Sequence, residues 1–296
     1  MNKTNFMILL ILSAIWGSSF LFMRMAAPVL GPVVLIAFRV GLAALFLLLI
    51  ALMLKKELVF FANCRHFLTL GTLNAGIPFL CLAYGAQTLS ASLLSIINAT
   101  APIWGAIIGA ILHRSKVDVT TAIGLALGVT GVSVLVGNDK LIEQDGALLA
   151  IFVALGAPFF YGIASHYAKS AKKLDSFANA NGSMWGAFLP ILPAVYFFPA
   201  STTQVSMSVI LAVLLIGVVC SGIAYLLFFR LISEVGPTSA LTVTFLVPVF
   251  GIFWGWFLLE EEVGVHTFIG SFIVIFGTAL VTGFNPFKKA TKAISS

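Results

Sequence analysis

Long apolar stretches separated by short polar intervals run through the whole chain. Hydropathy, together with the positions of Gly, Pro and charged residues, predicts apolar segments of about twenty residues each. They lie at about 6–25, 33–54, 66–87, 92–112, 119–137, 146–168, 177–198, 208–232, 237–259 and 265–283. About twenty helical residues cross roughly 30 Å of hydrocarbon, whereas barrel strands would be half as long and would alternate in polarity. The pattern therefore predicts an all-α integral membrane protein with ten transmembrane helices.

The composition strengthens this picture. Hydrophobic residues make up 60% of the 296 residues, charged residues make up 9%, and the mean hydropathy is +1.12. These values lie far outside the range of soluble domains. The connections between the apolar segments are about ten residues at most, so the pattern leaves no room for an attached soluble domain.

Lys and Arg residues indicate the orientation, because positive charges near the spans are retained on the cytoplasmic side. If the N-terminus is cytoplasmic, the outer segments hold only Arg24 and Lys140, and Arg39 lies within a span. All other basic residues then fall on the inner side: Lys3, Lys55, Lys56, Arg65, Arg114, Lys116, Lys169, Lys172, Lys173, Arg230, Lys288, Lys289 and Lys292. We therefore expect a multi-pass protein of the cell (inner) membrane with both termini in the cytoplasm. The net charge of +6 reflects this topology and does not indicate nucleic-acid binding.

An internal repeat divides the chain into two halves. A shift of 145 residues aligns Trp16-Gly17 with Tyr161-Gly162 and Gly41 with Gly186. A shift of 146 residues aligns these pairs without a gap: Gly71 and Gly217, Gly76 and Gly222, Pro102 and Pro248, Gly105 and Gly251, Gly109 and Gly255, Gly124 and Gly270, Gly131 and Gly277, and Gly137 and Gly283. The repeat predicts a five-helix unit at 1–138, a second at 146–285, and a basic cytoplasmic tail at 286–296.

The odd number of spans in each unit determines how the units relate to the membrane. The second unit must enter the membrane from the side opposite to the first. Such inverted repeats are characteristic of secondary transporters, in which the two halves expose a site near the midplane to each side in turn. We therefore expect two inverted five-helix repeats.

Three stretches of this sequence resemble one known family. They are "AIWGSSFLFMR" at 14–24, "FRVGLAALFLLL" at 38–49 and "AYLLFFRLISEVGPTSALTVTFLVPVFGIFWGWFLLEEEV" at 224–263. They are similar to the EamA-type carriers of the drug/metabolite transporter superfamily, and the resemblance covers essentially the full chain. The family's Gly-Pro-x-x-Ala entry to the ninth span, its central proline and its Gly-x-x-x-Leu-x-Glu exit are matched by Gly236–Ala240, Pro248, and Gly255 with Glu260. In the fourth span, His113-Arg114 stands where the family often has Gly-Glu.

The resemblance implies a ten-helix carrier with a central cavity. On this basis we expect a secondary transporter that moves small metabolites across the membrane by alternating access, most often exporting amino acids or related compounds. A multidrug or toxic-compound exporter of the same fold is the main alternative, because family members differ in cargo. A small-molecule substrate and the lipid bilayer are the expected partners, and the sequence leaves open whether the protein is a monomer or a homodimer.

Two other classes of membrane protein find less support. A membrane-embedded enzyme is disfavoured because HExxH and GxSxG motifs are absent and the histidines at 66, 113, 166 and 266 are scattered. A channel is disfavoured because no charged ring or carbonyl filter motif is visible. Cys64, Cys81 and Cys220 lack metal-ligand spacing, so we expect no metal and no cofactor.

Pro102 and Pro248 are predicted to break their helices near the middle of the membrane. Each removes an intrahelical hydrogen bond, and helix breaks at equivalent positions of two repeats are a sequence pointer to a transport site. A passive kink explains them equally well. The repeated glycines are predicted mainly to let helix backbones approach closely.

Arg39 is a charged residue about seven positions inside its span, roughly 10 Å from the membrane edge. An unpaired charge at this depth is costly, so Arg39 must have partners. One interpretation is that it binds a substrate carboxylate. The other is that it caps backbone carbonyls or extends outward to the membrane surface.

His166 is the leading candidate for proton coupling, since its titration range suits proton exchange and no Asp or Glu falls in any span centre. It also has a passive interpretation as a residue at the headgroup level. A facilitative carrier would need no such group.

Other polar and aromatic residues in the spans could line a cavity. Asn74 and Asn98 could orient a polar ligand or bond a neighbouring helix. The aromatic candidates are Trp16, Tyr84, Tyr161 and Tyr225. Because the repeat makes Trp16 and Tyr161 equivalent, we expect them to face one another across the axis that relates the halves.

Glu260, Glu261 and Glu262 form an unusual acidic run in a chain with ten acidic residues. The repeat aligns this corner with Arg114 and Lys116, on the opposite side of the predicted membrane. This corner is predicted to lie on the outer side of the membrane, where basic residues are disfavoured. That position explains the acidic run better than a cation site does. Glu260, which matches the family motif, is expected to have a structural partner at the helix end.

Overall fold

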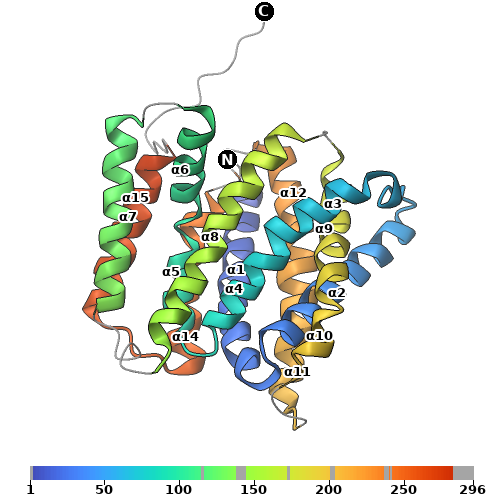
Figure 1. The fold of residues 1–296 in the computed structure, drawn as a ribbon, viewed down its shortest axis with the longest axis horizontal. Coiled ribbons are helices and arrows are strands. Elements are labelled where there is room, and N and C mark those ends of the chain that lie inside the picture. Colours follow the sequence, from blue (N-terminus) through green and yellow to red (C-terminus); the bar gives the residue numbers. More distant parts are fainter. Residues whose placement is uncertain are drawn as a thin grey trace, which may run out of the picture.

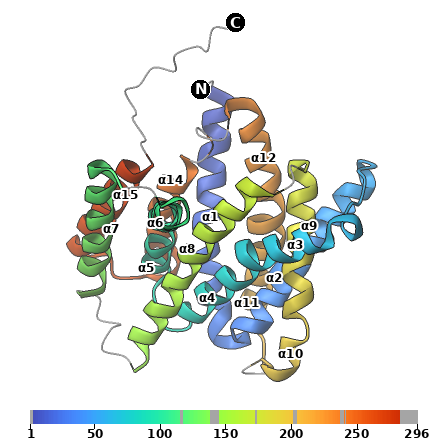
Figure 2. The same ribbon diagram turned by 45° about the horizontal axis from the view of Figure 1, so that its top comes forward.

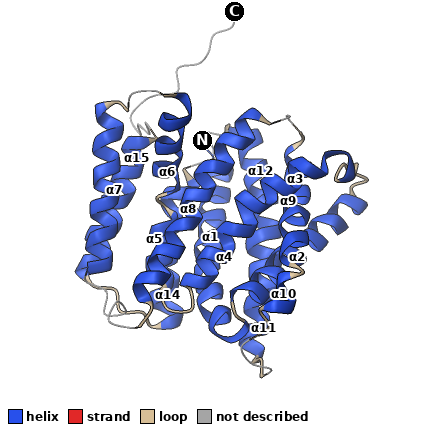
Figure 3. Cartoon of the chain, in the orientation of Figure 1, coloured by secondary structure: helices blue, strands red, loops and turns tan. Residues whose placement is uncertain are grey.

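The computed structural model describes residues 3–114, 117–137, 145–171, 174–200, 204–236, 240 and 242–282. All regular secondary structure among these residues is helical (Figures 1 and 3). The predicted tail at 286–296, Lys116, and most of the Gly236–Ala240 entry motif lie outside the described residues.

The first half of the chain forms the helices coloured blue to green in Figure 1. They are α1 (Lys3–Leu30), α2 (Pro32–Met53), η1 (Phe61–Asn63), α3 (Cys64–Gly71), η2 (Thr72–Gly76), α4 (Ile77–Gly85), α5 (Ala91–Asn98), α6 (Ala101–His113) and α7 (Val119–Gly137). The second half forms α8 (Ala147–Ser170), α9 (Ser176–Ile191), α10 (Ala194–Phe197), α11 (Met207–Leu214), η4 (Leu215–Ile223), α12 (Ala224–Val235), α14 (Val243–Leu259) and α15 (Val265–Val281).

Membrane-spanning character is strong along most of these helices. In the described part of the chain, 7 helical stretches are long and apolar enough to cross a membrane. They are Lys3–Leu30, Pro32–Met53, Phe61–Gly85, Ala91–His113, Val119–Val136, Ala147–Ser170 and Met207–Val235. The helices α14 and α15 are apolar but shorter, and α9 is a 16-residue helix in place of the predicted span 177–198. The all-helical membrane architecture agrees with the sequence, whereas the count of ten spans stays a prediction.

Two helices contain a π-helical segment, which the hydropathy pattern does not reveal. The segment η2 lies between α3 and α4, and η4 lies between α11 and α12. The repeat shift of 146 residues carries η2 into the interior of η4, so both halves widen the same helix at the same place. Such π segments are rare and are often found at functional sites.

The helices α7 and α15 pack side by side along their length, at the left of Figures 1 and 2. A Cβ atom added to Gly124 would lie 2.6 Å from the carbonyl oxygen of Gly277, and one added to Gly131 would lie 2.9 Å from that of Gly270. The two helices are therefore antiparallel and touch through bare backbone. In the repeat, Gly124 corresponds to Gly270 and Gly131 corresponds to Gly277. The shift of 146 residues therefore converts the contact of Gly124 with Gly277 into the contact of Gly270 with Gly131.

The sequence repeat also relates a second pair of glycine contacts. A Cβ atom on Gly17 of α1 would lie 2.9 Å from the backbone nitrogen of Gly251 on α14, and one on Gly162 of α8 would lie 3.0 Å from that of Gly105 on α6. Gly17 corresponds to Gly162, and Gly251 corresponds to Gly105. The glycines thus act in close helix packing, as expected.

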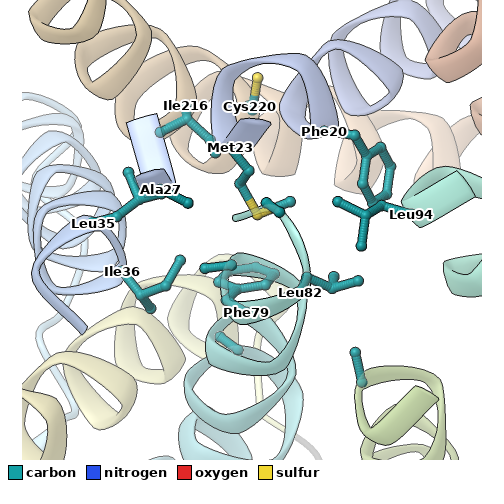
Figure 4. Close-up of a cluster of buried hydrophobic side chains, with 14 of the residues drawn as sticks. Phe20, Met23, Ala27, Leu35, Ile36, Phe79, Leu82, Leu94, Ile216 and Cys220 are labelled. Carbon is teal, nitrogen blue, oxygen red and sulfur yellow. The ribbon is translucent and has the colours of Figure 1, made fainter. Parts of the chain in front are cut away.

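The hydrophobic core lies where α1 meets helices from both halves. Figure 4 shows Met23 of α1 between Cys220 of η4 and Phe79 of α4. Met23 is fully buried, and Phe79 and Cys220 are nearly so. This core surrounds the candidate site.

Candidate functional site

Arg39 on α2 is buried inside the protein, with only 4% of its surface exposed. Its Nε donates a hydrogen bond to Ser221 Oγ at 3.0 Å, and its Nη1 lies 3.5 Å from Met23 Sδ. Its Cζ lies 3.6 Å from the centroid of the Phe79 ring. These side-chain partners show that Arg39 neither caps backbone carbonyls nor extends to the membrane surface.

Arg39 has no carboxylate partner within the described residues. The ion pair found there joins Arg230 to Glu234 at 3.0 Å, on the exposed surface of α12. The titratable groups that interact electrostatically with Arg39 are Tyr161, Tyr225 and Cys220. A buried guanidinium is thus compensated here by neutral groups alone, which is an expensive arrangement in an apolar interior.

Tyr225, which lies near Arg39, is surrounded by three further candidate residues. Asn74 forms a side-chain hydrogen bond with Tyr225, and Tyr161 interacts electrostatically with both Tyr225 and Arg39. The ring of Trp16 meets that of Tyr225 edge-on at 6.4 Å. The structure therefore brings together five of the predicted cavity residues.

We call this group the Arg39 cluster. It consists of Trp16, Arg39, Asn74, Phe79, Tyr161, Cys220, Ser221 and Tyr225.

The Arg39 cluster is built largely from equivalent positions of the two halves. The shift of 145 residues pairs Trp16 with Tyr161, and the shift of 146 residues pairs Phe79 with Tyr225. The latter shift also pairs Asn74 with Cys220. Arg39 breaks the pattern, since its equivalent is Met184, a fully buried apolar residue. The cluster thus draws on equivalent positions of both halves and adds one cation that has no charged equivalent.

The two π segments supply polar groups to the cluster. Asn74 belongs to η2, whereas Cys220 and Ser221 belong to η4. Ser221 Oγ itself donates to the carbonyl oxygen of Ile216, five residues earlier, at 3.0 Å. This bond orients the hydroxyl so that its lone pairs face the Arg39 Nε–H. The local helix widening therefore helps to position the Arg39 contact.

Trp16 does not pack on Tyr161 as predicted. Its ring partners in the described structure are Tyr225 and Phe228, with the Phe228 centroid at 5.1 Å. Trp16 packs on rings next to the Arg39 contacts, and Tyr161 lies near Arg39, but no ring contact joins Trp16 and Tyr161 in the described structure. Repeat equivalence alone does not fix direct contact.

Two other candidates lie apart from the Arg39 contacts. Tyr84 is 36% exposed near the end of α4, where its carbonyl oxygen accepts from Gln87 Nε2 at 3.3 Å. Asn98 ends α5, and its buried Oδ1 has no hydrogen-bond partner in the described structure. The structure joins neither side chain to Arg39.

The predicted helix break occurs at Pro102 but not at Pro248. The helix α5 ends at Asn98, and α6 begins at Ala101 with Pro102 in its first turn. Thr278 of α15 donates to the carbonyl oxygen of Ala99 at 3.2 Å and so occupies the gap. The helix α14 runs through Pro248 without interruption. One lost N–H bond does not end a helix that neighbouring bonds and packing support.

His166 packs against α6. Its Nε2 lies 2.8 Å from the carbonyl oxygen of Gly105. Since a carbonyl only accepts, Nε2 carries a proton and donates this hydrogen bond. The ring of His113 lies 5.9 Å away, centroid to centroid.

His166 also lines a cavity of about 440 Å³ between α6, α7, α8 and α15. His113, Asp118 and Lys169 are the other titratable residues in its lining. Asp118 lies outside the helices, and the hydrogen bond from the Thr121 hydroxyl lowers the pKa of its carboxyl group. The residues that line this cavity do not include any member of the Arg39 cluster.

Glu261, and not Glu260, has the structural partner expected for the acidic run. Its carboxylate accepts from the backbone N–H of Ala91 at 2.6 Å and from both the N–H and the hydroxyl of Ser92. Glu260 instead ends α14 with a left-handed φ of 53°. Counted from Gly255, the family spacing Gly-x-x-x-Leu-x-Glu also reaches Glu261, so the motif was aligned one residue short.

Sequence reasoning missed Met23, Phe79, Ser221 and Cys220 as neighbours of Arg39. A signal was present for two of them, because Phe79 and Cys220 are the repeat equivalents of Tyr225 and Asn74. Met23 and Ser221 carried no such signal. A search for possible metal ligands among the described residues finds no group of three His, Cys, Asp or Glu side chains.

Comparison with known families gives two consecutive matches to one family. The model of the EamA-like transporter family matches residues 4–137 and again residues 148–283. The chain belongs to this family. Each match covers one of the two halves that the sequence repeat defines, so the EamA-family resemblance and the repeat agree.

Relatives of this EamA-family chain are similar along nearly their whole length. The uncharacterized transporter YoaV of Bacillus subtilis is 23% identical over 271 residues, which cover 90% of this chain and 93% of the relative. A probable amino-acid metabolite efflux pump of Escherichia coli is 22% identical over 293 residues, which cover 94% of each.

A crystal structure of another protein has the same overall fold as this EamA-family chain. It superposes with a TM-score of 0.64 at 14% identity, covering 95% of this chain and 96% of that chain.

Proposed function

We propose that this protein is a secondary transporter that moves small metabolites across the membrane by alternating access, with the Arg39 cluster as its substrate site. Amino acids or related compounds are the proposed cargo, and export is the proposed direction. The observation that carries this proposal is the construction of the cluster from equivalent positions of both halves. Residues from both halves can then rearrange around one central ligand.

The proposed architecture has ten spans in two inverted five-helix units. The antiparallel contact of α7 and α15 supports it, because these helices are the equivalent last helices of the two halves. The contacts Gly124–Gly277 and Gly131–Gly270 are exchanged by the repeat, as a two-fold axis in the membrane plane requires. Parallel duplication would orient α7 and α15 the same way.

The proposed location is the inner membrane with both termini in the cytoplasm. The distribution of Lys and Arg supports this orientation. With this orientation, the cavity beside His166 opens toward the cytoplasm, because Arg114 and Lys169 lie at that end.

One relative supports the proposed cargo. The Escherichia coli relative is described as a probable amino-acid metabolite efflux pump and spans 94% of this chain. An amino acid carries a carboxylate, which suits a site containing one buried arginine. His166 is the proposed proton-coupling residue, because it lines the cavity between α6, α7, α8 and α15 beside His113, Asp118 and Lys169.

Counterflow in proteoliposomes tests the transport proposal. Purified protein is reconstituted and loaded with one of a panel of unlabelled L-amino acids, and entry of the same labelled compound is followed. We expect saturable entry that the internal unlabelled compound accelerates. Linear flux without acceleration across the whole panel would reject a carrier and favour a channel.

A further inference from the structure

The cavity between α6, α7, α8 and α15 changes character along its depth. Its inner part follows one face of α6, made of Pro102, Gly105, Ala106, Gly109 and Ala110. Its mouth carries ionisable and hydroxyl side chains, namely His113, Asp118, Thr121, Lys169 and Thr282. From Pro102 to His113, α6 rises about 16 Å. The cavity is thus lined by small residues in its depth and by polar residues at its edge.

The inner wall of the cavity is nearly bare helix backbone. A Cβ atom added to Gly105 would meet Ser165 Oγ at 3.9 Å and no closer atom, whereas the ring of His166 lies directly over Gly109. The Ser165 hydroxyl donates to the carbonyl oxygen of Gly162, and His166 Nε2 donates to that of Gly105. Because these donors are already used, the inner part suits a hydrocarbon chain better than a polar solute.

The mouth of the cavity carries an unpaired cation. Asp118, the acidic residue in the lining, accepts from the backbone N–H of Thr121 at 3.3 Å and from its hydroxyl at 2.5 Å. Its negative charge therefore serves the first turn of α7. Lys169 is exposed in the last turn of α8 and makes no ion pair within the described part of the chain. An anion with several oxygen acceptors matches Lys169 and the neighbouring ring of His113.

The helices around the cavity are joined unevenly. The helices α7 and α15 pack on each other along their length, whereas only short contacts join this pair to α6 (Figure 2). The helix α6, in contrast, packs extensively on α8. The cavity lies along the seam between the two pairs, so a ligand that fills it connects them.

The shape and charge of the cavity together select one class of ligand. A free phosphate would leave the apolar depth unfilled, and a zwitterionic lipid would bring its own cation to Lys169. A phospholipid with a net negative headgroup satisfies both parts at once, because its phosphate remains at the membrane edge while an acyl chain enters the hydrocarbon region. Basic pockets between membrane helices on the cytoplasmic side suit such headgroups.

We propose that this cavity binds one anionic phospholipid of the cytoplasmic leaflet, with the phosphate at Lys169 and His113 and one acyl chain along the small-residue face of α6. The inference rests on the proposed orientation, which places this end of α6 at the cytoplasmic surface, and it does not depend on the cargo. The bound lipid holds the pair α7 and α15 against α6 and α8.

Lipid retention by the purified full-length chain tests the inference. Native mass spectrometry and thermal unfolding are measured in detergent with dioleoyl phosphatidylglycerol, with the phosphatidylcholine of the same chains, or with glycerol phosphate. We expect one phosphatidylglycerol retained per chain, and thermal protection by this lipid alone. Equal retention of both lipids, retention of neither, or equal protection by glycerol phosphate would overturn the inference. Neither measurement involves transport, so such a result would leave the carrier proposal standing.

Two variants address the two ends of the cavity. Lys169→Gln should lower the affinity for phosphatidylglycerol roughly fivefold, the scale of one basic residue at an anionic surface. Ala106→Leu fills the apolar part and should abolish retention. Arg230→Gln and Leu112→Phe alter exposed side chains outside the cavity and should bind the lipid normally. Unchanged affinity in Lys169→Gln, or normal retention in folded Ala106→Leu, would overturn the proposal.

Discussion

Glu261 and Ser92 are joined twice, because the Glu261 carboxylate accepts from the Ser92 backbone N–H at 3.1 Å and from its hydroxyl at 2.6 Å. Glu261 follows α14 in the second half of the chain, whereas Ser92 lies in the first turn of α5 in the first half. A carboxylate at a helix N-terminus satisfies unpaired N–H groups and interacts favourably with the helix dipole. The acidic run thus contributes a cap that ties the two halves together.

Glu261→Gln should weaken this tie, because an amide presents a donor where three donors already converge. Charge-assisted hydrogen bonds contribute about 1.5–3 kcal/mol, so we expect a loss of stability of about 1–3 kcal/mol in thermal unfolding. Hydrogen exchange should accelerate in the first turn of α5. Glu260→Gln is the matched control, since Glu260 makes no such contact and should leave both measurements unchanged. Equal effects of the two variants would contradict the cap.

Gly255→Ala should disrupt the same tie sterically. An added Cβ would lie 2.3 Å from Glu261 Oε2 and 2.9 Å from Ser92 Oγ, so the carboxylate would have to move away from α5. We expect the stability loss to resemble that of Glu261→Gln, and the double variant to show less than the sum of the two losses. Gly105→Ala is the control, because its nearest neighbour to a new Cβ would be Ser165 Oγ at 3.9 Å. Strictly additive losses would argue against a shared mechanism.

Arg24→Gln should loosen the connection between α4 and α5 at the end where α4 stops. Arg24 Nη1 donates to the carbonyl oxygens of Ala86 at 3.1 Å and Gln87 at 2.7 Å, just after α4 ends. Losing this C-terminal cap should reduce stability by about 0.5–1.5 kcal/mol and speed hydrogen exchange near residues 85–90. Protection that is unchanged there would show that the Arg24 contact contributes nothing.

His166→Gln should separate proton coupling from structure. A glutamine amide can still donate to the Gly105 carbonyl in place of Nε2, but it does not titrate. We expect counterflow without a pH gradient to persist, whereas transport driven by a pH gradient should be lost. His266→Gln serves as a control on α15, away from the cavity beside His166. Gradient-driven transport that survives in His166→Gln would end the coupling proposal.

The helical architecture was accessible from the sequence because hydropathy and length report directly on membrane-spanning helices. The predicted segment 119–137 coincides with α7 at Val119–Gly137. The π segments were not accessible, because Thr72–Gly76 has no composition that distinguishes it from regular helix. Pro102 and Pro248 occupy equivalent positions in the sequence repeat. Whether the helix breaks at each proline is decided by the packing around it.

The candidate site was predicted in outline through the repeat and the rarity of buried charge. Arg39, Trp16, Tyr161 and Tyr225 were identified because polar or aromatic groups stand out in apolar spans. The contacts of Arg39 with Met23 and Ser221 depend on helix rotation and on the bond from Ser221 to Ile216, which spacing along the chain does not encode. Glu261 was missed because its partners lie about 170 residues away.

Alternating access requires that the Arg39 cluster is exposed to each side of the membrane in turn. Cys220 reports on this directly, since it is a cluster residue with 1% of its surface exposed. With Cys64 and Cys81 replaced by serine, a small membrane-impermeant thiol reagent is added to right-side-out or to inside-out vesicles. The account predicts slow labelling of Cys220 from both sides, and slower labelling when an exchanged carboxylate is present. Labelling from one side alone, or none from either side, would contradict it.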